Sequence, residues 1–417
     1  MNNTDSIQTL DKGLGRLSAP LADVARQTGW NLLREDLSLP TAVLYESRLA
    51  NNLAWMQSFS EAYGLKLSPH GKTTMTPALF QRQLDGGAWG ITLATAHQAA
   101  VAAAHGVKRV LLANQLVGRR NIELIAELVA KGDFEFFCLV DSPEGVEQLG
   151  KIFAERSQVV NVLIEIGVVG GRTGVRDAAQ QAAVLAAIDR YKQSVALAGV
   201  EFYEGVLEGE AAIRAFVRRA VDLTAELAKA GRLQRSPAIV SGAGSAWYDL
   251  VAEGFAEAKL DIPVDFVLRP GCYLTHDAGA YRTAQARIES SNSVAQKMRA
   301  GLVPALELWA YVQSIPEPTR AIIGLGKRDA AFDAGLPIPI RHFRPGAKSP
   351  SSTPAGWKLS RIMDQHAFLD LAPGDDLRVG DMLAFDISHP CLTFDKWRTI
   401  PVVDDDYNVV DVVRTYF

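Results

Sequence analysis

The stretch 159–166, VVNVLIEI, is a nearly unbroken run of aliphatic residues. A strand that is buried on both faces needs such a continuous apolar sequence, because neither of its sides contacts water. The stretches 134–140, FEFFCLV, and 197–203, LAGVEFY, repeat the pattern before and after it, and segments long enough for a helix separate the three. Strands that alternate with helices imply parallel pairing and right-handed crossovers.

Eight apolar runs of this kind lie between Leu65 and Leu274. They are Leu65–Pro69, Trp89–Ala94, Arg109–Asn114, Phe134–Val140, Val159–Ile166, Leu197–Tyr203, Ala238–Val240 and Asp265–Leu268. Between them, segments such as Ala211–Ala230 carry apolar residues at helical spacing. The pattern predicts an α/β fold with a (β/α)₈ TIM barrel over residues 41–285. An open, doubly wound sheet with fewer strands is the alternative.

After about Tyr281 the helical pattern fades, and Gly and Pro separate short strand-like runs. These runs are Ala305–Val312, Ala321–Gly324, Trp357–Ile362, Met382–Ile387 and Val409–Tyr416. They predict a C-terminal antiparallel β domain over residues 286–417. Residues 1–40 hold one amphipathic stretch, Leu21–Leu33, and we expect this N-terminal segment to pack on the β domain.

The overall composition excludes several classes of protein. The chain has 417 residues, a net charge of −4, 48% hydrophobic and 22% charged residues, which is too apolar for a disordered protein. A near-neutral balance gives no general attraction to nucleic acid or to an anionic membrane, so we expect neither partner. The first residues, MNNTDSIQTLDKG, lack the features of a signal peptide. Three sparse cysteines argue against a disulfide framework, so a cytoplasmic location is expected.

A barrel carries its active site at the C-terminal ends of its strands, and polar residues collect at those ends in this sequence. The first strand is followed by SPHGK, residues 68–72. An amine such as that of Lys72, if desolvated in the mouth of a barrel, has a lowered pKa and can form an imine. The simpler interpretation is a solvated surface lysine.

The seventh strand is followed by SGAGS, Ser241–Ser245. Gly242 and Gly244 would let backbone N–H groups approach an anion, and Ser245 could cap the next helix, whose N-terminus favours a phosphate. An ordinary glycine-containing loop is the alternative. A phosphate site opposite a reactive lysine points to pyridoxal 5′-phosphate (PLP) as the cofactor.

The motif His389-Pro390-Cys391 could bind a metal ion, because residues two apart in an extended segment point to the same side. Imidazole and thiolate suit Zn²⁺ better than Mg²⁺. Two ligands are too few for a closed structural site, so water or substrate would complete the shell. A buried cysteine beside a hydrogen-bonded histidine is the alternative, and His366 is a further candidate ligand.

Seven motifs together resemble those of the D-threonine aldolase and eukaryotic-type D-serine dehydratase family, fold-type III PLP enzymes with an alanine racemase-like barrel. The resemblance runs from about Pro40 to the C-terminus. The motifs are SPHGKTTMTP, EIGVVGGRTGV, YEG at 203–205, SGAGS, RPGCYLTHD, GKRDAAFDAGLP and SHPCLTFDKWR.

The resemblance implies a role for each matching residue. Lys72 resembles the catalytic lysine that holds the cofactor, and His389 and Cys391 resemble the metal ligands. The remaining cofactor-binding positions that it implies are His70, Arg172, Tyr203, Gly242, Ala243, Gly244, Ser245 and Tyr273. Three residues depart from the family pattern, namely Gly167 for Asp, Gln98 for Glu and Leu392 for Thr.

The expected function is a PLP- and metal-dependent lyase for D-3-hydroxy amino acids, acting by β-elimination to a 2-oxo acid and ammonia. Zn²⁺ is the expected metal, with Mn²⁺ or Mg²⁺ as alternatives. Retro-aldol cleavage to glycine and an aldehyde is the main rival, and Cys391 disfavours it because family aldolases tend to carry Asp there. Racemisation and a non-catalytic PLP-binding protein are weaker rivals. By analogy with the family, we expect a homodimer with the active site near the interface.

Overall fold

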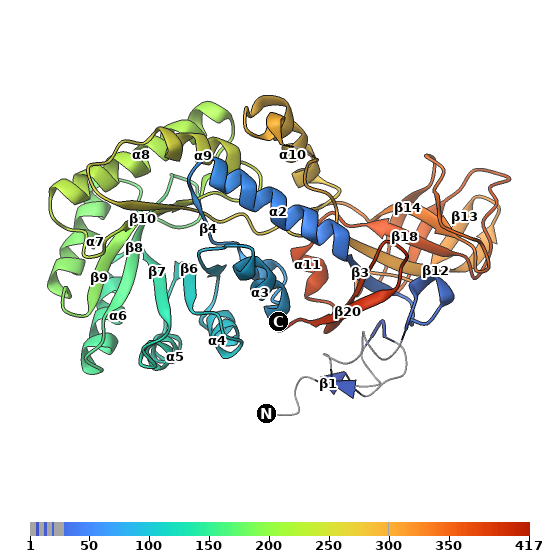
Figure 1. Ribbon diagram of the computed structural model, residues 1–417, viewed down its shortest axis with the longest axis horizontal. Coiled ribbons are helices and arrows are strands. Elements are labelled where there is room, and N and C mark those ends of the chain that lie inside the picture. Colours follow the sequence, from blue (N-terminus) through green and yellow to red (C-terminus); the bar gives the residue numbers. More distant parts are fainter. Residues whose placement is uncertain (1–5, 8–11, 15–18, 21–28, 299) are drawn as a thin grey trace.

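A curled parallel sheet and a separate, mainly antiparallel sheet form the two halves of the protein (Figure 1). The computed structural model describes residues 6–7, 12–14, 19–20, 29–298 and 300–417. The expected amphipathic stretch Leu21–Leu33 lies largely outside the described residues. None of the described helices is long and apolar enough to cross a lipid bilayer.

The parallel sheet has eight strands, one at each of the eight predicted apolar runs. They are β4 (Lys66–Leu67), β5 (Ile91–Leu93), β6 (Arg109–Gln115), β7 (Glu135–Val140), β8 (Val160–Ile166), β9 (Val195–Phe202), β10 (Ala238–Gly242) and β11 (Val264–Leu268). Their order is β4-β11-β10-β9-β8-β7-β6-β5, and a parallel bridge between His70 and Thr92 brings the two edges together. The prediction of an eight-stranded barrel is confirmed.

Helices cover the outside of this sheet (Figure 1). They are α2 (Glu46–Ala62), α3 (Pro77–Asp85), α4 (Ala96–Ala104), α5 (Arg119–Val129), α6 (Pro143–Glu155), α7 (Ala178–Arg190), α8 (Glu210–Lys229), α9 (Tyr248–Glu257) and α10 (Ala280–Ser291). Thr95, Ser142 and Asp177 immediately precede α4, α6 and α7, and the side chain of each accepts a hydrogen bond from the backbone N–H three residues further along the chain. These caps satisfy donors that the first helical turn leaves unpaired.

Side chains from successive strands fill the interior of the barrel. The interior cluster consists of Leu111, Phe137, Leu139, Leu163, Ala198, Ile239 and Val267, all nearly inaccessible to solvent. The other faces of the same strands pack against the helices. Because the strands are buried on both sides, the apolar runs are continuous rather than alternating.

The second sheet is antiparallel except where β19 pairs in parallel with β3. Its elements are β3 (Thr41–Tyr45), β12 (Leu306–Glu317), β13 (Arg320–Ile323), β14 (Ile338–Phe343), β15 (Ser351–Ser352), β16 (Lys358–Ile362), β17 (Ala367–Asp370), β18 (Met382–Asp386), the short helix α11 (Cys391–Phe394), β19 (Thr399–Val403) and β20 (Val409–Arg414). The strand β3 differs from expectation, because the prediction began the barrel at residue 41. It pairs with β12 and β19 instead.

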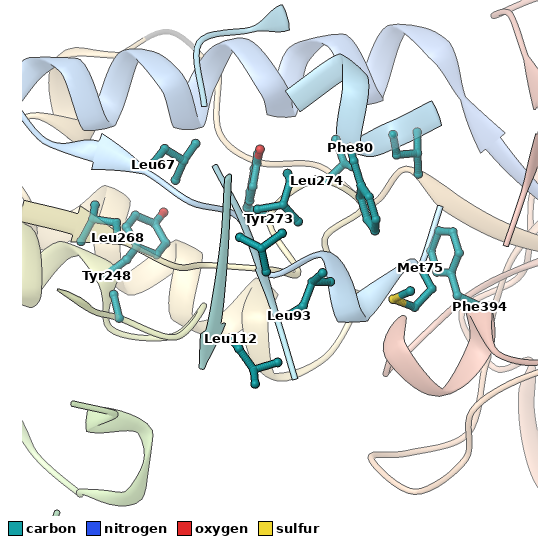
Figure 2. Close-up of a cluster of buried hydrophobic side chains, with 14 of the residues drawn as sticks. Leu67, Met75, Phe80, Leu93, Leu112, Tyr248, Leu268, Tyr273, Leu274 and Phe394 are labelled. Carbon is teal, nitrogen blue, oxygen red and sulfur yellow. The ribbon is translucent and has the colours of Figure 1, made fainter. Parts of the chain in front are cut away.

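The barrel and the second sheet pack closely where the barrel strands end. Figure 2 shows Met75, from the segment after β4, next to Phe394 of α11, and both belong to one apolar cluster. The backbone N–H of Tyr416 donates to the carbonyl of Met75 at 2.8 Å. In the N-terminal segment, Lys12 forms an ion pair with Asp329 of the second domain at 2.6 Å. The second domain therefore faces the C-terminal ends of the first barrel strands.

Candidate active site

A pocket of about 280 Å³ opens at the C-terminal ends of the barrel strands, and residues of the second domain form part of its wall. Nine of the residues that the sequence predicts for the site line it. They are His70, Lys72, Arg172, Tyr203, Ala243, Gly244, Ser245, His389 and Cys391. Residues that are more than 300 positions apart in the chain thus share one cavity.

Lys72 lies in the short 3-10 turn Gly71–Thr73 that follows β4. Its side chain is accessible through the mouth of the pocket, while the surrounding protein desolvates the amine. This desolvation lowers the pKa of Lys72 from its usual value, and the positive charge of Arg172 adds to the effect, although Cys391 opposes it. A lysine with a lowered pKa is a better nucleophile and a better base near neutral pH.

The side chain of His70 lies near three cationic side chains, Lys72, Arg269 and Arg172. Burial lowers the pKa of His70 well below its usual value, and the charges of Lys72, Arg269 and Arg172 lower it further. Its Nδ1 atom is buried and has no hydrogen-bond partner. The guanidinium of Arg172 lies 4.5 Å from the centroid of the Tyr203 ring. This part of the pocket therefore favours an anionic, hydrogen-bonding ligand.

The glycine loop after β10 is arranged differently from the prediction. The backbone N–H groups of Ala243 and Gly244 donate to the carboxylate of Glu204, at 3.1 Å and 2.6 Å. Glu204 is fully buried and does not line the pocket, so these two N–H groups are not free for an anion. Burial raises the pKa of Glu204, and the N–H groups of the loop lower it in part. In this arrangement the two amides bind Glu204, and phosphate binding by this loop stays a prediction.

Ser245 also has a different role from the one predicted. Trp247, not Ser245, precedes the first residue of α9. The Oγ atom of Ser245 accepts the N–H groups of Gly271 and Cys272, at 3.2 Å and 3.1 Å. It therefore connects the loop after β10 to the loop after β11, and the prediction that it caps the helix is wrong.

Three other predicted residues do not line the pocket. Gly242 lies at the end of β10, where an added Cβ atom would meet the Phe202 ring at 2.4 Å. The hydroxyl of Tyr273 is buried and accepts a hydrogen bond from Gln83 at 3.1 Å. His366 lies between β16 and β17, in a hairpin away from the pocket. The structure does not bring these side chains to the candidate site.

His389 and Cys391 line the pocket on the side of the second domain. Nδ1 of His389 lies 2.7 Å from a carboxylate oxygen of Asp333. Hydrogen bonds with the Cys391 sulfur and with Asp333 raise the pKa of His389 to about 9, although burial opposes them. Hydrogen bonds from Cys272, His389 and Thr73 lower the pKa of Cys391. These contacts favour the thiolate form of Cys391, which is the form that binds a metal.

The donor set is an open one. Within the described residues, no three His, Cys, Asp or Glu side chains are arranged to hold a metal ion together. A carboxylate that fixes one ring nitrogen of a histidine is a frequent outer partner of a metal ligand. His389 and Cys391 alone would leave the other positions of a metal to water or substrate, and the metal site stays a prediction.

Several pocket residues were not among the predicted site residues, and four of them have side chains that can form hydrogen bonds or ion pairs close to the predicted ones. They are Thr73, Arg269, Cys272 and Tyr281. Arg269, which is buried, forms an ion pair with Glu201 of β9. Asp333 was also not singled out, although it lies within the motif GKRDAAFDAGLP at residues 326–337. Most of these residues follow a strand end or lie inside one of the quoted motifs, and either feature could have been used to predict them.

Comparisons with known proteins agree with both halves of the fold. The model of the family "Alanine racemase, N-terminal domain" matches residues 45–277, and that of the "Putative serine dehydratase domain" matches residues 305–403. The chain is 26% identical over 388 residues to a D-threonine aldolase of Arthrobacter sp, covering 91% of this chain and 92% of that protein. It is 29% identical over 240 residues to the D-threo-3-hydroxyaspartate dehydratase of Delftia sp. (strain HT23), covering 56% and 62%.

Solved structures share the fold. The D-threonine aldolase from Filomicrobium marinum superposes with a TM-score of 0.73 at 22% identity, covering 93% of this chain and 97% of the other. D-threo-3-hydroxyaspartate dehydratase from Delftia sp. HT23 superposes with a TM-score of 0.70 at 22% identity, covering 93% and 99%. Because a family model matches more than half of its length, the chain belongs to the family of proteins with an alanine racemase N-terminal domain.

Proposed function

We propose that this protein is a PLP- and divalent metal-dependent lyase that acts on D-3-hydroxy amino acids and eliminates the β-hydroxyl group. The observation that carries the proposal is that Lys72, His389 and Cys391 line one and the same pocket. The relatives are named as aldolases and dehydratases of D-threonine and of 3-hydroxyaspartate, which supports the substrate class.

The pocket residues fit PLP. Lys72 offers the amine, and the cationic surroundings of the unpartnered Nδ1 atom of His70 suit an anionic cofactor. An added Cβ atom at Gly244 would lie 2.9 Å from the Tyr203 ring. The absence of a side chain at Gly244 therefore leaves room in the pocket beside Tyr203. When bound, PLP would supply an aldehyde for the substrate amine and a ring that stabilises negative charge at the α-carbon.

Side chains of the barrel and of the second domain would supply the remaining functions, namely proton transfer, cofactor binding and metal binding. Lys72, whose pKa is lowered, can accept the α-proton at its Nζ atom and return it to solvent. Arg172 and Tyr203 lie beside each other and can hold the cofactor ring. His389 and Cys391 would hold the metal, which acts as a Lewis acid toward an oxygen ligand. Asp333 keeps the His389 ring oriented.

The donor chemistry favours elimination over retro-aldol cleavage. A thiolate and an imidazole prefer Zn²⁺, whereas a carboxylate at position 391 would suit Mg²⁺ or Mn²⁺. Hydroxide is a poor leaving group, so elimination needs a strong Lewis acid next to the β-oxygen. The aldolase names among the relatives keep retro-aldol cleavage as the second candidate.

Product identification tests the proposal. The protein is incubated with PLP, Zn²⁺ and, separately, D-serine, D-threonine and 3-hydroxy-D-aspartate. We expect a 2-oxo acid and ammonia in equal amounts. Glycine with an aldehyde would establish the second candidate, and no turnover of any of the three by a PLP-loaded protein would overturn both.

A further inference from the structure

A second thiol lies against Cys391. The two Sγ atoms of Cys272 and Cys391 are 3.8 Å apart. Cys272 belongs to the loop after β11, while Cys391 begins α11 of the second domain, so the contact joins the two halves of the protein. The hydroxyl of Thr73 completes a triangle, 3.3 Å from the sulfur of Cys391 and 4.0 Å from that of Cys272.

The two neighbours of Cys391 are buried. Cys272 is 4% exposed and Thr73 is 1% exposed, whereas Cys391 is partly accessible. The backbone N–H of Cys272 donates to Ser245 Oγ, which ties it to the loop after β10. Thr73 follows Lys72 in the same turn. Neither side chain can move far without disturbing the pocket.

In the described part of the chain, Cys272 does not form a group of three metal-binding side chains with His389 and Cys391. It is placed to donate its S–H to the sulfur of Cys391. A thiolate that binds a metal keeps lone pairs that accept hydrogen bonds. Donors of this kind orient the ligand and tune its charge without touching the metal.

We propose that Cys272 and Thr73 are positioning residues for the metal centre, whose side chains contact the Cys391 sulfur and hold it in place beside His389. This inference rests on the proposed function, since a metal on His389 and Cys391 is part of it. The loop after β11 would then have two roles. Its backbone binds Ser245 of the glycine loop, and its Cys272 side chain orients Cys391.

Zinc binding tests the inference separately from activity. The PLP-loaded full chain and its Cys272→Ala, Cys272→Ser and Thr73→Val variants are titrated with Zn²⁺ against a chromophoric chelator. X-ray absorption at the zinc edge then counts the sulfur ligands. Cys138→Ala is the matched control, because Cys138 is buried in β7 and does not line the pocket. Circular dichroism confirms that each variant is folded.

We expect Cys272→Ala to weaken zinc binding by about 10- to 100-fold, with one sulfur ligand in both the parent and the variant. Cys272→Ser should recover most of the affinity, because a hydroxyl also donates. Two sulfur ligands in the parent protein would overturn the inference, since Cys272 would then be a ligand itself. Unchanged affinity in both Cys272→Ala and Thr73→Val would also overturn it.

Different results would contradict the proposed function and this inference. If Cys391→Ser leaves zinc affinity and the sulfur count unchanged, the metal is bound elsewhere and both the proposed metal centre and this inference are wrong. If Cys391→Ser abolishes binding while the Cys272 variants bind like the parent, only this inference is wrong. A Cys272→Ala chain that does not fold leaves Cys272→Ser and Thr73→Val to decide.

Discussion

Lys72 is the residue on which the proposed chemistry depends most. Replacing it by Ala removes the desolvated amine that binds the cofactor and accepts the α-proton, and we expect kcat to fall by about 10²- to 10⁴-fold. The absorbance of the protein-bound cofactor should change with it. Lys66→Ala, at an exposed lysine of β4, is the control and should retain activity. Undiminished turnover by the Lys72 variant would contradict its role.

Single residues also show which parts of the site cannot be predicted from sequence. Lys72, His389 and Cys391 were predictable, because each stands in a short motif whose chemistry is specific. Glu204 was not, because the chain folds back so that its carboxylate, 39 positions away, accepts the N–H of Ala243. Tyr273 follows a strand end as the site residues do, but its hydroxyl contacts Gln83 behind the pocket. Direction of a side chain depends on neighbours that are remote in sequence.

At the scale of elements, Gly242 lets β10 pass close to β9. An added Cβ atom would lie 2.4 Å from the Phe202 ring, so Gly242→Ala must displace a buried aromatic side chain. We expect the free energy of unfolding to fall by about 1–3 kcal/mol in denaturant titrations. Gly356→Ala, where the added atom meets nothing within 4 Å, should be nearly neutral. Equal stability of the two variants would show that β9 and β10 are not packed this way.

The turn after β11 gives the protein a pH-dependent stability. Burial lowers the pKa of His276 to about 4, and Arg282 contributes to the effect. Between about pH 6.5 and pH 4 the unfolded chain therefore binds a proton that the folded chain does not. The stability contribution of neutral His276 is complete above pH 6.5 and is lost as the pH falls toward 4.

We therefore expect His276→Asn to reduce the loss of unfolding free energy between pH 6.5 and pH 4 by up to about 3 kcal/mol. Asparagine tolerates the positive φ of 49° at this position. Urea titrations at several pH values measure the effect, and His366→Asn, at an exposed histidine, is the control. If the His276→Asn variant keeps the parent's pH dependence of stability, His276 is not its cause.

The elements themselves were largely predictable. All eight barrel strands follow continuous apolar runs, because burial on both faces requires them. The predicted barrel domain begins at residue 41, but the strand Thr41–Tyr45 belongs to the second sheet, because it pairs with β12 and β19. Local sequence predicts that a strand exists, whereas long-range pairing determines which sheet it joins.

At the scale of the whole molecule, we propose that a second copy of the chain covers the mouth of the pocket. Exposed apolar side chains lie close in sequence to pocket residues on both walls, namely Val169, Val206 and Leu392. Phe332, also exposed, is next to Asp333, the hydrogen-bond partner of His389. Light scattering should give the mass of a dimer, and a Val169→Asp, Leu392→Asp double variant should shift it toward the monomer. Val379→Asp, at another exposed valine, should not. A parent protein that is monomeric at high concentration would contradict the proposal.

The account as a whole requires one substrate to contact both walls of the pocket. The most direct measurement is a crystal structure of the protein grown with PLP and Zn²⁺. We predict cofactor density continuous with the Lys72 side chain and a metal ion bound by His389 and Cys391 in the same pocket, close enough for one hydroxy amino acid to reach both. Cofactor bound away from Lys72, or zinc bound outside this pocket, would contradict the central claim.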